Sequence, residues 1–318
     1  PLNRGFDEFY GFIGGARSYF PTPAPKPGEK DSVAALTFRA PVESARKPVE
    51  WEGYLTDRLA AEAASFVRRR KAGPFFLYVA FNAVHTPLQA TEKHLDRVKH
   101  VADPRQRTYL AMVAALDDAV GTILSAVGEA GLDERTLIVF LSDNGGPTDK
   151  YAVNGSSNAP LRGSKGDTWE GGVRVPFLLR WKGRLPAGKV YDEPVIQLDL
   201  LPTAVAAAGG RADPGWRLDG ADLLPFLTGA APGRPHATLY WRLGPHWAIR
   251  HGNWKVVQTY RSGEAKLFDL SADVGESRDL RGEKPEVYAD LRARWESWNR
   301  TLAEPRWIDP QPNPYDPA

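Results

Sequence analysis

The chain has 318 residues, of which 42% are hydrophobic and 25% charged, so it can bury a sizeable core and is neither fibrous nor intrinsically disordered. Its 41 basic and 39 acidic residues give a net charge of +2 and are mixed along the chain, which does not indicate a nucleic-acid-binding protein. Cysteine is absent, which excludes disulfides, thiolate metal sites and a cysteine nucleophile.

The first residue is Pro1 and the single methionine is Met112, within a strongly helical pattern. We therefore expect the chain to be the remainder of a longer one, so that an export signal cannot be read from it. The apolar runs stop at about eight residues, against the roughly 20 that a membrane span needs, so we expect no span.

The first third of the chain predicts a loop region, then a helix, then a strand. Residues 1–50 are rich in glycine, aromatic residues and proline without a clear period, so no regular element is predicted there. Apolar residues on one helical face predict a helix from Leu55 to the Gly73-Pro74 stop. The continuous run FFLYVAF, residues 75–81, predicts a strand buried on both faces.

The same order of elements then repeats. Residues 109–127 have helical periodicity, and residues 136–141 predict a second buried strand. A helix followed by a buried strand, twice, predicts right-handed crossovers in an α/β sheet. A third strand is predicted over 176–181, and a short helix over 199–208.

The C-terminal part predicts a different architecture. Four short apolar runs separated by Gly, Asn and Asp predict a small antiparallel sheet, over 238–241, 247–250, 254–258 and 266–270. Residues 286–299 predict a closing helix. We expect a large domain over residues 1–230 and a small one over 231–318.

Candidate ligand-binding residues follow the predicted strands, because ligands of open α/β sheets bind beyond the carboxyl ends of the strands. Asp143 and Asn144 follow the strand at 136–141 and offer hard oxygen ligands suited to calcium or magnesium. The alternative is an ordinary Asx turn.

Two further residues are candidates for contact with an anionic substrate. His85 follows the strand at 75–81 and could donate a proton or bind an anion, the alternative being a histidine satisfied by a backbone carbonyl. Lys165 lies in a glycine-rich frame and could bind an oxyanion, the alternative being an exposed loop lysine. The other five histidines are assigned no functional role.

Eight segments, in this order, resemble the sulfatase family of the alkaline-phosphatase-like superfamily: PLNRGFDEFYGF, VHTP, LSDNGG, PLRGSKGDTWEGGVRVP, DLLPT, LDGADLLPFLTG, AIRHGNWK and LFDL. The resemblance extends to arylsulfatases and N-acetylgalactosamine-6-sulfatases. It implies an α/β fold with a mixed, mostly parallel sheet between helices and a small C-terminal antiparallel subdomain. The implied activity is hydrolysis of a sulfate ester.

The resemblance also implies residue roles. Asp143 and Asn144 match the family's second pair of ligands to an active-site calcium ion, with magnesium the less expected ion. His85 matches the histidine that contacts the sulfate and the leaving oxygen, and Lys165 the lysine that bridges the sulfate ester. Relatives are usually periplasmic, secreted or lysosomal, and the sequence gives no indication of oligomeric state.

The chain departs from the family pattern at the nucleophile. Sulfatases attack with a formylglycine made within a Cys/Ser-x-Pro-x-Arg segment and hold the metal with a further Asp-Asp pair, and we expect both upstream of Pro1, since the sequence contains no Cys/Ser-x-Pro-x-Arg segment. We therefore expect this chain alone to bind calcium weakly, to expose apolar surface and to be inactive.

Two alternative functions remain open at this stage. One is a phosphodiesterase or phosphonate hydrolase of the same superfamily, because fold does not determine which ester is cleaved. The other is a non-catalytic protein that binds sulfated glycans through Lys165 and His85. The substrate is also open: Trp169, Trp241 and Trp247 are candidates for stacking on sugar rings, which favours a sulfated carbohydrate over a small aryl sulfate.

Overall fold

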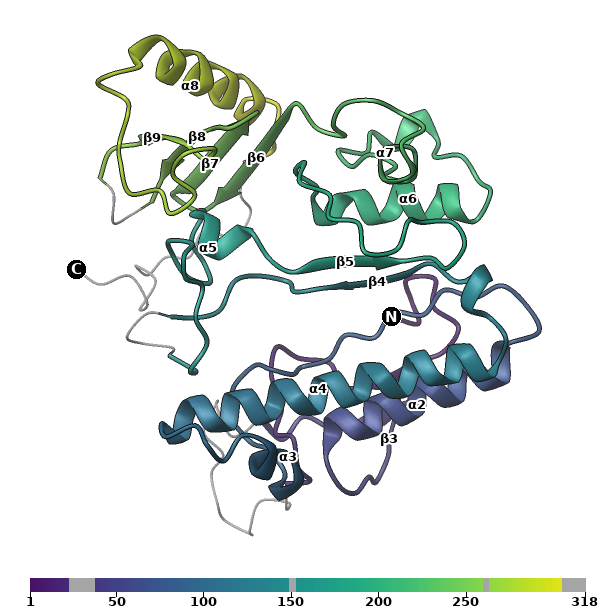
Figure 1. Ribbon diagram of the computed structural model, residues 1–318. Coiled ribbons are helices and arrows are strands. Elements are labelled where there is room, and N and C mark those ends of the chain that lie inside the picture. Colours follow the sequence, from purple (N-terminus) through teal and green to yellow (C-terminus); the bar gives the residue numbers. More distant parts are fainter. Residues whose placement is uncertain (23–37, 149–152, 260–262, 305–318) are drawn as a thin grey trace. The chain divides into compact units, whose positions relative to one another are not determined.

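The computed structural model describes residues 1–22, 38–148, 153–259 and 263–304 (Figure 1). The chain forms two compact units. The first comprises Pro1–Asp133 and Asn154–Ser156, and the second comprises Glu134–Val153 and Ser157–Ala318. The boundary near residue 230 remains a prediction, since residues on both sides of it belong to the second unit.

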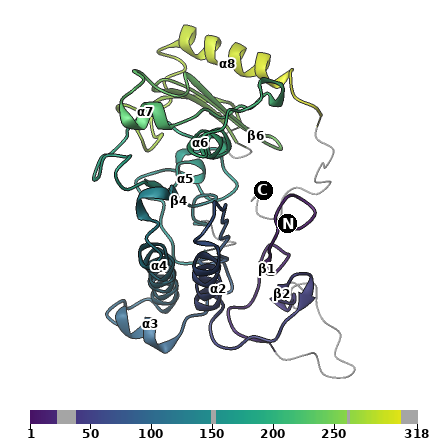
Figure 2. The same ribbon diagram turned by 90° about the vertical axis from the view of Figure 1, so that its right-hand side faces the viewer.

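The first unit is built on two long helices that lie side by side, α2 (Leu55–Arg70) and α4 (Pro104–Glu129) (Figure 2). Both were predicted, and both are confirmed. Buried alanines at every fourth position of α4, from Ala111 to Ala119, allow close helix packing. Asp103 caps α4 by accepting the backbone N–H of Gln106 at 2.7 Å. The short helix α3 (Glu92–Arg97) packs on α4.

By length and composition alone, α4 could cross a membrane, whereas no span was expected from the sequence. One face of α4 is buried within the first unit, however, and Asp118 near its middle pairs with Arg97 and Lys93 of α3. Much of its apolar character is therefore used in packing against α2.

Three two-residue strands were not predicted. β1 (Tyr10–Gly11), β2 (Glu43–Ser44) and β3 (Lys47–Pro48) form an antiparallel sheet in the order β1-β2-β3. Strands of this length are too short to show an alternating hydrophobic pattern. Of the proline-rich segment at 21–30, residues 23–30 lie outside the described residues.

The strand predicted at 75–81 is not formed. Its side chains alternate between half-buried and exposed, with Phe76 at 68% and Tyr78 at 70% exposure. No described residue forms a strand pair with this segment. The prediction that both faces are buried is therefore wrong, as is the crossover inferred from it, because an apolar run alone cannot show whether a pairing partner exists.

In the second unit, β4 (Ile138–Leu141) and β5 (Phe177–Arg180) pair antiparallel, with Leu141 opposite Phe177. Both strands were predicted, but neither is buried on both faces, since Phe140 is 39% and Leu178 57% exposed. The helices α5 (Glu170–Val173), α6 (Leu200–Ala207) and α7 (Leu224–Thr228) accompany this pair. The helix predicted at 199–208 corresponds to α6.

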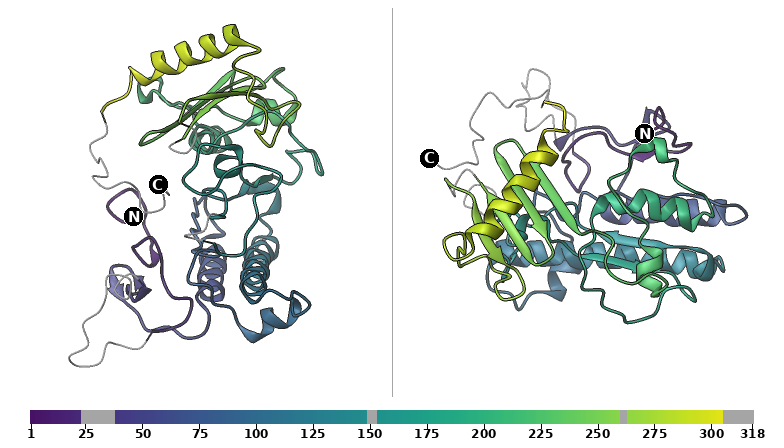
Figure 3. Two further views of the ribbon diagram at one scale, coloured as in Figure 1. Left: turned by 90° about the vertical axis from the view of Figure 1, so that its left-hand side faces the viewer. Right: turned by 90° about the horizontal axis from the view of Figure 1, so that it is seen from above.

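The C-terminal sheet is as predicted. β6 (Thr238–Leu243), β7 (His246–His251), β8 (Trp254–Gln258) and β9 (Lys266–Asp269) pair antiparallel in sequence order. The helix α8 (Pro285–Asn299) lies across one face of this sheet (Figure 3). Leu291 of α8 packs on Ile249, Val256 and Leu267, which are fully buried.

The ion pairs of Asp118 predict a pH-dependent contribution to stability. Hydrogen bonds from Arg97 and Lys93 hold the pKa of Asp118 well below its usual value. Such a carboxyl stabilises the fold above its unfolded pKa, near 3.9, and the contribution is lost as the pH falls through the folded pKa. Asp118→Asn should lower the melting temperature by about 1–3 °C at pH 7, with a smaller difference from the unmodified chain near pH 2.

Thermal unfolding followed by circular dichroism at the two pH values measures this effect. Asp117→Asn is the matched control, because Asp117 is the residue of α4 directly before Asp118 and its side chain is exposed. An equal decrease in both variants, or a decrease for Asp118→Asn that does not depend on pH, would contradict the assignment.

Candidate functional site

The turn after β4, residues 142–146, packs directly on the backbone of the loop before β5. The Gly145 N–H donates to the Gly172 carbonyl at 3.0 Å, and the Ser142 N–H donates to the Pro176 carbonyl at 3.2 Å. A Cβ atom at Gly145 would lie 1.7 Å from the Gly171 carbonyl oxygen. Only glycine therefore permits this contact.

The loop from 162 to 172 is itself folded through close backbone approaches. A Cβ at Gly171 would lie 2.5 Å from the Arg162 oxygen, and one at Gly172 would lie 2.2 Å from the Asp167 oxygen. Gly163 has φ of +94°, in the left-handed region, and a Cβ there would lie 2.6 Å from the Cβ of Trp169. The glycine-rich frame around Lys165 is thus required by the backbone.

The turn and the loop bring three of the predicted site residues onto adjoining segments. The Lys165 N–H donates to the Gly146 carbonyl at 3.2 Å, two residues beyond Asn144. The side chain of Asn158 joins the same two segments, since its amide group donates to the carbonyls of Gly146 and Gly163 at 2.8 and 3.0 Å. The Lys165 side chain is exposed.

The side-chain oxygens of Asp143 and Asn144 do not form the Asx turn that was the alternative interpretation. Such a turn needs one of these oxygens to accept a backbone N–H, and no bond of this kind occurs there among the described residues. Asn144 instead donates its amide N–H to the Gly145 carbonyl at 2.9 Å. The side chain of Gln197 donates to the backbone carbonyls of Ser142 and Asp143, each at 3.0 Å. The turn is thus held through its backbone.

These oxygens suit calcium in kind but are few in number. Calcium takes about six to eight oxygen ligands, and Asp143 and Asn144 supply two side chains. Within the described ranges, no group of three or more His, Cys, Asp or Glu residues could hold a metal ion. The calcium site therefore remains a prediction.

His85 belongs to the first unit, whereas the other three predicted residues belong to the second. The four residues' convergence on one site is therefore still a prediction. The His85 side chain is exposed, and its Nδ1–H donates to the Thr86 carbonyl at 2.8 Å, which leaves Nε2 for a ligand. The fully buried Tyr19 donates its hydroxyl to the His85 carbonyl at 2.8 Å and so holds the loop.

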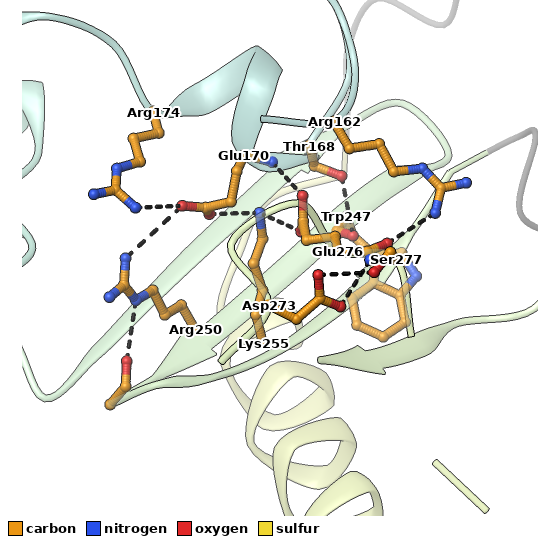
Figure 4. A network of polar contacts seen from close by, with 11 residues as sticks. Arg162, Thr168, Glu170, Arg174, Trp247, Arg250, Lys255, Asp273, Glu276 and Ser277 are labelled. Atoms are coloured by element: carbon orange, nitrogen blue, oxygen red, sulfur yellow. Dashed lines mark hydrogen bonds and ion pairs between the residues drawn. The ribbon is translucent and has the colours of Figure 1, made fainter. Parts of the chain in front are cut away.

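A buried ionic network that sequence reasoning missed lies behind the loop (Figure 4). Lys255 of β8 donates to Glu170 Oε1 at 2.8 Å, and its Nζ lies 3.0 Å from Glu276 Oε1. None of the three side chains is more than 2% exposed. The one sequence signal was a lysine within the apolar strand WKVV, whereas the two glutamates follow no recognisable pattern.

The two glutamates respond differently to the lysine that they share. Burial raises the pKa of Glu276, and the charge of Lys255 offsets only part of this effect. Burial also acts to raise the pKa of Glu170, but the charges of Lys255, Arg250 and Arg174 outweigh it, so that the pKa is lowered. Glu170 is therefore the carboxylate that balances Lys255.

The interpretation that Trp169 and Trp247 bind sugar is wrong. They are 4% and 8% exposed, respectively, and Arg162 covers the Trp169 ring at 4.1 Å. Trp241 is partly buried and packs on the same cluster as Trp169. All three contribute to packing.

Among the five histidines left without a functional role, His251 lies 2.7 Å from the Thr238 hydroxyl within the second unit, and two more have partners within their units. His94 is 1% exposed and lies between Thr91 and Asp118, and His236 pairs with the fully buried Asp199 at 2.7 Å. Both make structural contacts.

Comparison with known proteins identifies two matching family profiles. One, described as Sulfatase, matches residues 1–210, and the other, described as N-sulphoglucosamine sulphohydrolase, C-terminal, matches residues 165–300. Steryl-sulfatase of Mus musculus is 41% identical over 201 residues, covering 62% of this chain and 31% of that protein. Arylsulfatase D of Homo sapiens is 33% identical over 269 residues, covering 73% and 44%. The chain thus spans less than half the length of these two curated relatives.

Solved structures with similar folds include the crystal structure of Ps i-CgsB in complex with k-i-k-neocarrahexaose. The TM-score is 0.87 at 34% identity, covering 97% of this chain and 69% of that one. BT4656 in complex with D-glucosamine-2-N,6-O-disulfate has a TM-score of 0.72 at 17% identity and shows a similar fold.

The contact at Gly145 predicts a large effect of a single methyl group. Gly145→Ala should destabilise the second unit by at least about 1–3 kcal/mol, because the new Cβ meets backbone that cannot rotate away. Urea unfolding monitored by tryptophan fluorescence measures the change. Gly282→Ala is the control, since nothing lies within 4 Å of a Cβ built there. Equal stability of the two variants would show that the turn does not pack on the loop as described.

Proposed function

Because this chain belongs to the sulfatase family and has its alkaline-phosphatase-like fold, we propose that it acts in the hydrolysis of a sulfate ester. The observation that carries this proposal is the contact between the turn with Asp143 and Asn144 and the loop with Lys165. It gathers oxygen ligands for a cation and an ammonium group on adjoining segments, beyond the end of β4.

The chemistry of the ester fits these groups. Cleavage of the S–O bond builds negative charge on the leaving oxygen, which positive groups stabilise and a proton neutralises. Lys165 would bind the sulfate oxygens and the bridging oxygen through its ammonium group. His85 would deliver a proton to the leaving oxygen from Nε2, with its ring orientation set by the bond from Nδ1 to Thr86.

Asp143 and Asn144 would hold calcium, which supplies positive charge next to the sulfate when bound. No residue of the printed sequence fits the family's formylglycine, since cysteine is absent and no serine stands in a Ser-x-Pro-x-Arg segment. The residues assigned here therefore bind the ester and move a proton, and none of them is the nucleophile.

We further propose a sulfated carbohydrate as the substrate. The support is the similarity to Ps i-CgsB, which was crystallised with a neocarrahexaose. An aryl sulfate is the second substrate class, since arylsulfatases are among the similar proteins. A location in the periplasm, in the lysosome or outside the cell fits such a substrate and remains a prediction.

Sulfate release tests the proposed function. The protein expressed from its complete reading frame, with calcium, should release sulfate from a chromogenic aryl sulfate and from sulfated carrageenan oligosaccharides, and a chelator should suppress the release. Ion chromatography measures the sulfate. Cleavage of a phosphate diester without sulfate release would support the phosphodiesterase alternative, and binding of sulfated glycan without cleavage would support the non-catalytic alternative. Either result would contradict the proposal.

Two lysines of the second unit distinguish the oxyanion contact from a general effect of charge. Lys165→Ala should lower kcat/KM by about 100-fold to 1,000-fold, because it removes a cation from the reacting oxygens. Lys189→Ala should leave kcat/KM nearly unchanged, because Lys189 lies in a different loop and donates to the Leu227 carbonyl of α7. Equal losses in steady-state kinetics would show that the contact has been assigned to the wrong lysine.

A further inference from the structure

The segment that carries Lys165 is held at both ends by one buried residue, Glu276. The Arg162 guanidinium donates to the backbone carbonyl of Glu276 at 2.9 Å. The backbone N–H of Glu170 donates to the side chain of Glu276, at Oε2, at 2.7 Å. In the sequence, Lys165 lies between these two anchor points, three residues after Arg162 and five before Glu170.

The segment is also closed on itself and tied to the C-terminal sheet. The Arg162 guanidinium stacks over the ring of Trp169 at 4.1 Å, so the two ends are in contact. The Thr168 hydroxyl donates to the Trp247 carbonyl of β7 at 3.2 Å. The loop is therefore tied at both ends, and within it the Ser164 N–H donates to the Asp167 side chain at 3.1 Å and the Asp167 N–H donates to the Ser164 carbonyl at 3.0 Å, on either side of Lys165.

Glu276 adopts an arrangement that is unfavourable for an ordinary structural residue. Its φ is +52°, in the left-handed region that residues other than glycine rarely adopt, and its side chain is fully buried. Two glutamates share the single buried ammonium of Lys255, with Arg250 and Arg174 at 4.0 and 3.7 Å from Glu170. Burying these charges is costly unless each is paired in a fixed geometry.

Lys165 itself has few contacts that could orient it. Its side chain is exposed, and among the residues that the structure describes its backbone bonds to Gly146, at 3.2 Å. The position of its ammonium group therefore depends on the frame on either side. A misplacement of about 1 Å in a group that acts on substrate can cost about 100-fold in rate.

We propose that Glu276 is a positioning residue, which sets the position of Lys165 by bonding to both ends of the 162–170 segment. Lys255 in turn fixes the position of the Glu276 side chain. The C-terminal sheet thereby takes part in forming the site without contacting the substrate. This proposal rests on the proposed function only in the role given to Lys165.

The test combines amide hydrogen exchange with a double-mutant cycle, in the protein expressed from its complete reading frame. Glu276→Ala removes the acceptor of the Glu170 N–H and should speed exchange at Lys165 and Gly171 by at least about tenfold. It should lower kcat/KM for an aryl sulfate by about 10-fold to 100-fold. In the Lys165→Ala background, it should cause little further loss, since the group being positioned is gone.

Two variants separate positioning from stability. Glu276→Gln keeps an oxygen acceptor for the Glu170 N–H but places an amide NH2 group where the Lys255 ammonium now lies 3.0 Å from an oxygen, so exchange at Lys165 and kcat/KM should change less than in Glu276→Ala. Glu283→Gln is the matched control, an exposed glutamate paired with Arg278 that should change neither quantity. If Glu276→Ala does not fold, Arg162→Met removes the other anchor from an exposed side chain and should give the same pattern at smaller size.

The outcomes are distinguishable. The proposal is overturned if the losses of kcat/KM caused by Glu276→Ala and Lys165→Ala multiply in the variant that carries both. It is also overturned if amide exchange at Lys165 is unchanged in Glu276→Ala or Arg162→Met. If the unmodified protein cleaves no sulfate ester, the proposed function fails, while faster exchange at Lys165 would still support the positioning role of Glu276.

Discussion

The contact between two stretches of glycine backbone is the constraint on which the candidate site depends. The turn after β4 and the loop before β5 approach so closely that Gly145 and Gly171 have no space for side chains. Since backbone atoms cannot rotate away, this contact sets the distance between the two segments more rigidly than side-chain packing would. The oxygens of Asp143 and Asn144 and the ammonium of Lys165 are presented from segments joined in this way.

The elements with a strong periodic pattern could be predicted from the sequence. The helices α2, α4 and α8 have apolar residues at helical spacing, and the four C-terminal strands are separated by turn residues, so local pattern and tertiary packing agree. The prediction of a strand over residues 75–81 was wrong, because strand formation requires a pairing partner and an apolar run such as FFLYVAF does not reveal one. The two-residue strands near the N-terminus lie below the length at which any period can be detected.

The residues of the candidate site were predicted from the sequence, but the buried residue that holds the Lys165 segment was not. Asp143 and Asn144 were found because they follow a predicted strand, and Lys165 was found because it lies in a glycine-rich segment that leads into another. Glu276 was missed because it lies more than 100 residues after Lys165, and a glutamate in a polar loop is usually solvated. Its role depends on a long-range contact with the Glu170 backbone, and one sequence without an alignment carries no trace of such a contact.

The network around Lys255 has a consequence for exchanging parts between related proteins. A chimera joined near residue 230 would take Glu170 from one parent and Lys255 with Glu276 from the other. A parent lacking Glu170 or Lys255 would leave the other charge without this partner in the interior, at a cost of roughly 3–5 kcal/mol. The two matching family profiles overlap over residues 165–210, which includes Glu170. A chimera that keeps these ion pairs should therefore take the loop from 162 to 172 and the C-terminal sheet from the same parent.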